Sequence, residues 1–178
     1  MIIVGENLRA LILGNTMCPL ELYDGSSILL KLGGTVFVPS KQEGRVIRYG
    51  LHEVDDFYKE KKLEEGELLL RPSECVLACS TDRIHMPAGY MGFIQTKGTL
   101  ARLFVITHCT DPQIDSGFNG KITFEIVNLS PFEIVLPVGS PVAQLFVSRV
   151  STENFPPYSG KYRDSDIPTL PRPFSASQ

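Results

Sequence analysis

GFIQTKGTLARLFVITHCTDPQIDSGFNGKITFE, residues 92–125, alternates apolar runs of strand length with short polar turns. This alternation is typical of β-structure. One turn, Lys97-Gly98-Thr99, carries a cation and a hydroxyl, and a second carries the carboxylate of Asp115. Cations, turn amides and two separated carboxylates, Asp115 and Glu125, are the groups that a nucleoside phosphate site requires. Each of them taken alone is more typical of an ordinary turn or strand residue.

The last strand of this stretch, residues 121–127, alternates with period two. Thr123 and Glu125 therefore share one face of the strand. A carboxylate on the inner wall of a β-pocket has its pKa raised by desolvation and can then both donate and accept a proton. A solvent-facing glutamate on an antiparallel strand gives the same pattern, and periodicity does not separate the two. The opposite face carries Ile122, Phe124 and Ile126.

The composition of the whole chain narrows its class. The 178 residues are 43% hydrophobic and 21% charged, which is typical of one globular domain. A net charge of −3 argues against a general nucleic-acid-binding protein, because such proteins usually carry a basic surplus. No apolar run approaches the ~20 residues of a transmembrane helix, and the N-terminal segment lacks the basic start of a signal peptide. We expect a cytoplasmic protein that binds neither nucleic acid nor membrane.

The order of patterns along the chain predicts a mostly β fold. Residues 2–15 read as a helix, 28–39 as strands and 40–66 as a solvated polar excursion. Many short strands with one helix indicate a barrel or sandwich. Residues 151–178 are rich in Pro, Ser and Asp, and we expect them to be extended or mobile until something orders them. The expected later strands are residues 67–72, 75–82, 89–97, 102–109, 120–128, 132–139 and 141–150.

Several motifs in one order carry a resemblance to a known family. They are TKGTLARL, an HxT triplet, QIDSGFNGKITFEIVN, GSPVAQLF and GKYR. Together they resemble the dCTP deaminase family, which is grouped with the trimeric dUTPases, and the resemblance covers about residues 66–165. It implies a distorted, dUTPase-like β-barrel of the β-clip type over residues 1–150, with residues 151–178 as a tail that closes over the active site. It also implies a homotrimer with active sites at the subunit interfaces.

The resemblance implies a hydrolytic deamination of dCTP to dUTP and ammonia, which supplies the precursor of dTTP. Glu125 matches the catalytic glutamate, and Arg102 would hold that carboxylate or the water network in place. Asp115 matches the aspartate that binds the deoxyribose 3′-hydroxyl. The segment that matches the family's triphosphate-binding residues is Lys97, Gly98, Thr99, Leu100 and Ala101. Other expected substrate contacts are Thr110, Asp111, Phe118, Thr123, Phe124, Gln144, Tyr158, Lys161, Tyr162 and Ser165.

The expected mechanism uses no zinc. Zinc deaminases carry HxE and PCxxC motifs, and neither is present. Cys75 and Cys79, four apart, lack the paired short spacing of a zinc site. A metal-free deaminase depends on general acid–base catalysis by Glu125. Mg²⁺ is expected only as a charge partner of the bound triphosphate, and dTTP is a candidate inhibitor.

Three departures from the family pattern keep alternatives open. Gly98 and Thr99 replace two serines that follow an arginine in the family, Asp111 replaces an alanine-type residue, and Ser165 replaces a glutamine in the tail. The second hypothesis is a dUTP diphosphatase or a bifunctional deaminase and diphosphatase, which Asp115 would serve. The third is a non-catalytic paralogue that binds dCTP or dTTP. Because Glu125 is retained, and trimeric dUTPases generally lack a glutamate there, deamination is the leading hypothesis.

Overall fold

A computed structural model describes residues 1–40, 43–51, 53–63, 66–152 and 156–174. Parts of the expected polar excursion, residues 41–42, 52 and 64–65, lie outside the described residues. The same holds for residues 153–155 and 175–178 of the expected tail.

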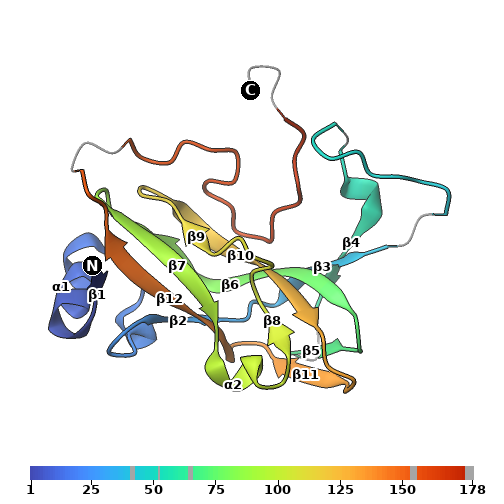
Figure 1. Ribbon diagram of the computed structural model, residues 1–178, viewed down its shortest axis with the longest axis horizontal. Coiled ribbons are helices and arrows are strands. Elements are labelled where there is room, and N and C mark those ends of the chain that lie inside the picture. The colour runs from blue at the N-terminus through green and yellow to red at the C-terminus, as the bar shows by residue number, and fades with distance from the viewer. Residues whose placement is uncertain (41–42, 52, 64–65, 153–155, 175–178) are drawn as a thin grey trace.

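Antiparallel strands form two larger sheets and one small one around a common core (Figure 1). The first sheet has the order β1-β12-β7-β9, with β2 also paired to β12, and the second has the order β4-β3-β6-β10-β8. β11 and β5 pair separately. The mostly β prediction is confirmed, and the sheets form a distorted barrel. The strands are β1 (Ile2–Ile3), β2 (Ile28–Lys31), β3 (Thr35–Pro39), β4 (Tyr58–Lys62), β5 (Glu67–Leu70), β6 (Cys75–His85), β7 (Tyr90–Thr96), β8 (Val105–Ile106), β9 (Gln113–Ile114), β10 (Asn119–Asn128), β11 (Ile134–Pro137) and β12 (Pro141–Arg149).

The helical prediction for the N-terminal segment is confirmed by α1 (Gly5–Asn15). Leu8, Leu11 and Ile12 are the buried residues of this helix, as expected from their common face. The helix ends at Thr16, whose φ of 50° leaves the right-handed region. Two short 3₁₀ helices, η1 (Leu20–Leu22) and η2 (Asp55–Phe57), complete the local structure. No helix among the described residues is long and apolar enough to cross a membrane.

Two expectations about local structure are wrong. Most of the strand expected over residues 102–109 is absent, and only β8 forms, after the short helix α2 (Gly98–Ala101). The chain turns there because the Phe104 amide bonds the Ala101 carbonyl and Phe104 adopts a φ of 57°. The charged run that ends the excursion is not purely solvated coil, since Tyr58–Lys62 pairs with β3 as β4. As an edge strand with exposed lysines, β4 keeps its charges in water while its backbone is paired.

Asn128 ties the end of β10 to neighbouring segments. It is fully buried, and its Nδ2 donates to the Leu70 carbonyl at 3.1 Å and to the Phe132 carbonyl at 2.8 Å. Its Oδ1 accepts from both the amide and the hydroxyl of Ser130, at 2.9 and 2.7 Å. Every polar atom of this buried side chain is therefore bonded.

Replacing Asn128 with Ala should lower the free energy of unfolding by about 2–4 kcal/mol, because it removes the acceptor of the buried Ser130 amide and a donor to the Leu70 carbonyl. Urea unfolding followed by circular dichroism at one protein concentration measures the loss. Asn7→Ala on the exposed face of α1 is the control, and it should change stability by less than about 0.5 kcal/mol. Equal losses in the two variants would contradict the assignment of a structural role to Asn128.

Candidate active site

A pocket of about 400 Å³ opens along β10 between the barrel and the tail. The barrel contributes lining residues from β6, β7, β10 and the segment that runs from β8 through β9 to β10. The tail contributes the rest of the lining through residues after 156. The lining residues are Leu77, Ile94, Asp111, Gln113, Ile114, Asp115, Phe118, Lys121, Ile122, Thr123, Glu125, Tyr158, Tyr162, Thr169 and Pro171.

Glu125 lies on the pocket wall and not on a solvent-facing surface of the sheet. Its strand alternates strictly between buried and half-buried residues, and Glu125 is half-buried opposite Leu77 of β6. Burial, and to a smaller extent the nearby charge of Asp111, raises the pKa of the Glu125 carboxyl to about 7. A carboxyl with this pKa exchanges a proton readily near neutral pH, which is what general acid–base catalysis needs.

Asp115 reaches the same pocket from a tight turn. The Phe118 amide donates to the Asp115 carbonyl at 3.1 Å, and Gly117 has a φ of +79°, which glycine adopts without strain. Ser116 is fully buried and its hydroxyl accepts from the Gly89 amide at 3.0 Å, so the turn is anchored to the barrel. The predicted turn is thus present. Phe118 follows it, and its ring lies 6.1 Å from that of Tyr158.

An irregularity in the sheet shapes the wall below Glu125. Three residues of β6, from Ser80 to Asp82, face the single residue Ile122 of β10. The buried Ser80 hydroxyl accepts from the Ile122 amide at 2.9 Å and donates to the Asp82 carbonyl at 2.7 Å. The irregularity therefore leaves the Ile122 amide satisfied. Bulges of this kind bend a strand and are frequent beside active sites.

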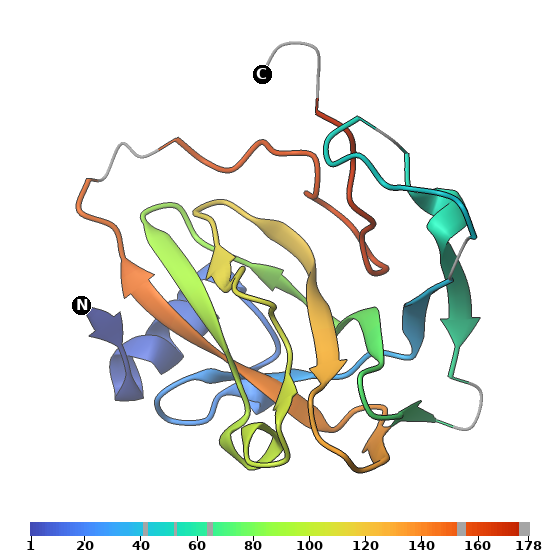
Figure 2. The same ribbon diagram turned by 45° about the vertical axis from the view of Figure 1, so that its right-hand side comes forward.

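The tail runs beside the part of β10 that β8 leaves unpaired (Figures 1 and 2), and it contributes residues to the pocket lining. The Asp164 amide donates to the Asn119 carbonyl at 2.7 Å, and the Lys121 amide donates to the Ser165 carbonyl at 2.8 Å. Further on, the Thr169 amide donates to the Thr123 hydroxyl at 3.0 Å. These bonds extend the sheet with irregular chain, and they hold the tail next to the face that carries Glu125.

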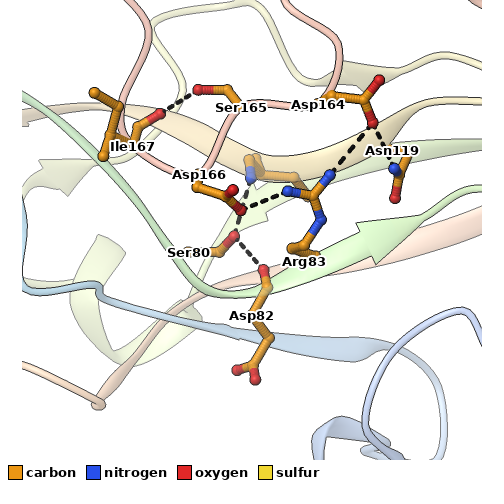
Figure 3. A network of polar contacts seen from close by, with 9 residues as sticks. Ser80, Asp82, Arg83, Asn119, Asp164, Ser165, Asp166 and Ile167 are labelled. Carbon is orange, nitrogen blue, oxygen red and sulfur yellow. Dashed lines mark hydrogen bonds and ion pairs between the residues drawn. The ribbon is translucent and has the colours of Figure 1, made fainter.

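Ion pairs with a residue of β6 also hold this part of the tail. Figure 3 shows Arg83 of β6 between two tail carboxylates, with ion pairs to Asp164 and Asp166. Asn119 Nδ2 also donates to the Asp164 carboxylate at 2.6 Å. Arg83 lies opposite Lys121 in the β6–β10 register, so the network stands beside the pocket wall.

The expected phosphate-binding segment, residues 97–101, lies away from the pocket. Lys97 precedes α2 and forms an ion pair with Asp24 at 3.6 Å, and Arg102 Nη1 donates to the Gly98 carbonyl at 3.0 Å. The Leu129 amide bonds the Phe104 carbonyl, four residues past Glu125 along β10. At about 3.3 Å per residue, this contact is roughly 13 Å from Glu125 along the strand. Within one chain the structure does not bring Lys97–Arg102 to the pocket.

Other expected contacts are divided between pocket, core and surface. Phe124 is fully buried in the core and does not line the pocket. Gln144 donates to the Ser27 hydroxyl at 2.9 Å, outside the pocket. Lys161 donates to the carbonyls of Arg172 and Pro173, at 2.9 and 3.3 Å. Those that line the pocket are Asp111, Asp115, Phe118, Thr123, Glu125, Tyr158 and Tyr162; Gly98, Thr99, Leu100, Ala101, Thr110 and Ser165 do not.

A family model described as dCTP deaminase-like matches residues 8–150. The chain belongs to the dCTP deaminase-like family. The predicted resemblance is therefore confirmed.

Relatives and a solved structure agree with the dCTP deaminase-like assignment. A dCTP deaminase of Halorubrum lacusprofundi is 33% identical over 67% of this chain and 62% of its own. A dUMP-forming dCTP deaminase of Halobacterium salinarum is 32% identical over 67% of this chain and 64% of its own. The matched part is thus less than two thirds of either relative. The 2′-deoxycytidine 5′-triphosphate deaminase of Agrobacterium tumefaciens superposes with a TM-score of 0.62 at 21% identity, over 84% of this chain and 48% of that one, which shows a common fold.

Sequence reasoning on this dCTP deaminase-like chain missed some lining residues. The sequence alone could have predicted Lys121, because period two places Lys121 on the same face as Thr123 and Glu125. Leu77 and Thr169 carry no local signal, since each meets β10 only through long-range pairing. No three His, Cys, Asp or Glu side chains in the described part of the chain gather to hold a metal ion.

Replacing Arg83 with Gln should loosen the tail, because it removes the charge that pairs with Asp164 and Asp166. Partly exposed ion pairs are worth about 0–1 kcal/mol each, so trypsin should cut after Lys161 or Arg163 roughly two to ten times faster. Arg71→Gln is the matched control, because Arg71 pairs with Glu74 and Glu133 away from the tail. Equal cleavage rates in both variants at low salt would contradict a holding role for Arg83.

Proposed function

We propose that this protein deaminates dCTP by hydrolysis, with Glu125 as the general acid–base group. The observation that carries the proposal is the Glu125 carboxyl, whose pKa burial raises to about 7, in one pocket with Asp115. Membership of the dCTP deaminase-like family and the names of the relatives support the same activity. The pocket size suits a nucleoside and not a longer polymer.

In the proposed reaction Glu125 takes a proton from water, and the water oxygen bonds to C4 of cytosine. The electron pair of the C4=N3 bond moves to N3, which receives that proton from Glu125. The remaining proton of the new C4 hydroxyl then passes through Glu125 to the amino nitrogen. The C4–N bond breaks, the C4 carbonyl forms and ammonia leaves. Water thus supplies the new oxygen and two protons, and the products are dUTP and ammonia.

The nucleoside end of the substrate fits the charges of this pocket. Asp115 is proposed to accept the 3′-hydroxyl of deoxyribose, and Phe118 to pack on the sugar. The phosphates do not fit, because the lining carries three carboxylates, Asp111, Asp115 and Glu125, and among the described lining residues Lys121 is the one cation. A triphosphate with its Mg²⁺ must therefore extend out of the pocket toward other cations.

A second copy of the chain would supply those cations. Beside α2, the apolar side chains of Leu103, Phe104, Leu129 and Phe132 are 48–65% exposed. Phe104 and Leu129 are joined by a main-chain bond, so these residues form a contiguous surface. This surface is a candidate contact between copies, and in such an assembly Lys97–Arg102 of one copy would complete the pocket of another. We propose a homotrimer with sites completed between chains, as the arrangement of a closed ring allows.

Replacing Glu125 with Gln should lower the rate of ammonia release from dCTP by at least about 10²–10⁴-fold, because Gln cannot take and return a proton. Nucleotide affinity should change little, since sugar and phosphate contacts remain. Exposed Glu67→Gln in β5 is the control for loss of one charge and should keep wild-type turnover. Near wild-type deamination by Glu125→Gln would remove Glu125 from the mechanism.

The same assay separates the second candidate function. Asp111 and Asp115 in the pocket, and the dUMP-forming activity in the name of one relative, favour a further hydrolysis of dUTP to dUMP and diphosphate. There Asp115 would orient water toward the α-phosphate. Diphosphate release from dUTP by the wild-type protein supports this step, and ammonia alone from dCTP supports a simple deaminase. Binding of dCTP without either product would identify a non-catalytic paralogue.

Mixing two inactive variants tests the shared site. Glu125→Gln lacks the proton carrier and Arg102→Ala lacks a cation of the other half. After unfolding and refolding together in equal amounts, roughly a quarter of the sites should combine both intact halves and regain activity. Mixing either variant with the double variant is the control and should restore nothing. No recovery in the first mixture, with assembly intact by light scattering, would contradict sites shared between chains.

A further inference from the structure

The turn before β2 holds the carboxylate of Asp24 at a fixed place. The Asp24 amide donates to the Ser27 carbonyl at 2.9 Å, which closes the turn. Gly25 within it has a φ of +68°, which glycine adopts without strain, and its carbonyl accepts from the Gly5 amide of α1 at 2.7 Å. The backbone of Asp24 is therefore anchored, while its side chain remains 43% exposed and can rotate into water.

Two donors from neighbouring strands converge on one oxygen of that carboxylate. The Nζ atom of Lys97, which follows β7, lies 3.6 Å from Asp24 Oδ2. Gln144 of β12 donates from Nε2 to the same oxygen at 3.4 Å. The Lys97 amide donates to the Val142 carbonyl at 2.9 Å, so adjacent strands of one sheet fix both donors (Figure 1).

The amide of Gln144 has a fixed orientation. Its Nε2 also donates to the hydroxyl of Ser27 at 2.9 Å, and Ser27 is fully buried. Because a carboxylate only accepts hydrogen bonds, the NH₂ group of Gln144 and not its carbonyl oxygen faces Asp24. Asp24 Oδ2 thus lies between an ammonium and an amide donor. These are groups that also hold a phosphate oxygen.

The contacts of Asp24 are weak enough to be replaced. Charge-assisted hydrogen bonds of good geometry are about 2.7–2.9 Å long, and those of Asp24 Oδ2 are 3.4 and 3.6 Å. A phosphate group carries up to about two negative charges and three strong acceptor oxygens, which is more than one carboxylate offers. A bound triphosphate should therefore displace the Asp24 side chain from Lys97 and Gln144.

We propose that Asp24 is an internal counter-anion: in the nucleotide-free protein its Oδ2 occupies the place where a phosphate oxygen of the substrate binds. Asp24 keeps the Lys97 ammonium and the Gln144 amide directed at one point, and its side chain rotates into water when the phosphates arrive. The inference rests on the proposed contact of Lys97 and Gln144 with the substrate, and it makes Asp24 a positioning residue. Its negative charge also weakens phosphate binding, because like charges repel at this distance.

Isothermal titration calorimetry with inorganic tripolyphosphate tests this role without turnover. Asp24→Asn keeps the size and removes the charge, so tripolyphosphate and dCTP should bind roughly three to ten times more tightly than to the wild type. The gain should shrink as the salt concentration rises from about 0.05 to 0.5 M, because salt screens exposed charges. Deoxycytidine, which has no phosphate, should bind both proteins equally. Exposed Glu67→Gln on β5, in the separate two-stranded sheet, should change the Kd for tripolyphosphate by less than about twofold.

Two further variants locate the effect. Asp24→Ser removes the same charge with a smaller side chain and should also bind tripolyphosphate more tightly. Lys97→Gln should bind it more weakly, because it removes the cation that Asp24 faces. Unchanged or weaker binding by folded Asp24→Asn and Asp24→Ser overturns the proposal. A gain that salt does not reduce, undiminished binding by Lys97→Gln or no binding by any of these proteins also overturns it.

Ammonia release from dCTP, measured separately, distinguishes this inference from the proposed deamination. Tighter tripolyphosphate binding by Asp24→Asn without ammonia from the wild type supports the role of Asp24 and contradicts deamination. Ammonia release by the wild type with no gain in binding by Asp24→Asn overturns the role of Asp24 alone.

Discussion

Burial of one face of β10 is the constraint on which the pocket depends. Ile122, Phe124 and Ile126 are at most 1% exposed, so the strand cannot rotate or slip by one residue without moving apolar side chains into water. Because the core holds that face, the opposite face holds Thr123 and Glu125 at fixed depth. Hydrophobic packing of one face of β10 thus fixes the position of the Glu125 carboxyl group on the other face. The same packing removes the water that would otherwise stabilise the charge of this group.

The tail adds to this arrangement without contributing a core of its own. It has no helix or strand among its described residues, yet it bonds the free edge of β10 and pairs with Arg83. Such contacts are individually weak and partly exposed, so the tail is held far less firmly than β10. A cover held by weak contacts can open and close without disturbing the barrel. It also explains why Thr169, remote in sequence, lines the pocket.

The sequence predicted the features that depend on local periodicity and missed those that depend on pairing. Alternation in residues 121–127 indicated both faces of β10, and turn chemistry located Asp115 correctly. Neither showed that the Glu125 face is a pocket wall, because Leu77 of β6 and the tail form the rest of it. The strand expected over residues 102–109 is largely absent because the chain turns at Phe104, whose φ is positive. Apolar composition does not predict that backbone conformation.

A desolvated carboxyl group costs the folded state stability at high pH. The pKa of Glu125 is about 7 in the folded protein against an ordinary 4.5, so the folded state binds more protons than the unfolded state between these values. The contribution of Glu125 to stability therefore falls as the pH rises from about 4.5 through 7, and it is not regained above that window. The backbone at Cys109 and Thr110 is strained, with φ values of 33° and 73°, and adds a cost that does not depend on pH. Both costs fall beside the pocket, while the apolar contacts of Ile122, Phe124 and Ile126 lie on the other face of the same strand. This separation lets the core of β10 hold the Glu125 carboxyl group with a pKa that the group would not have in water.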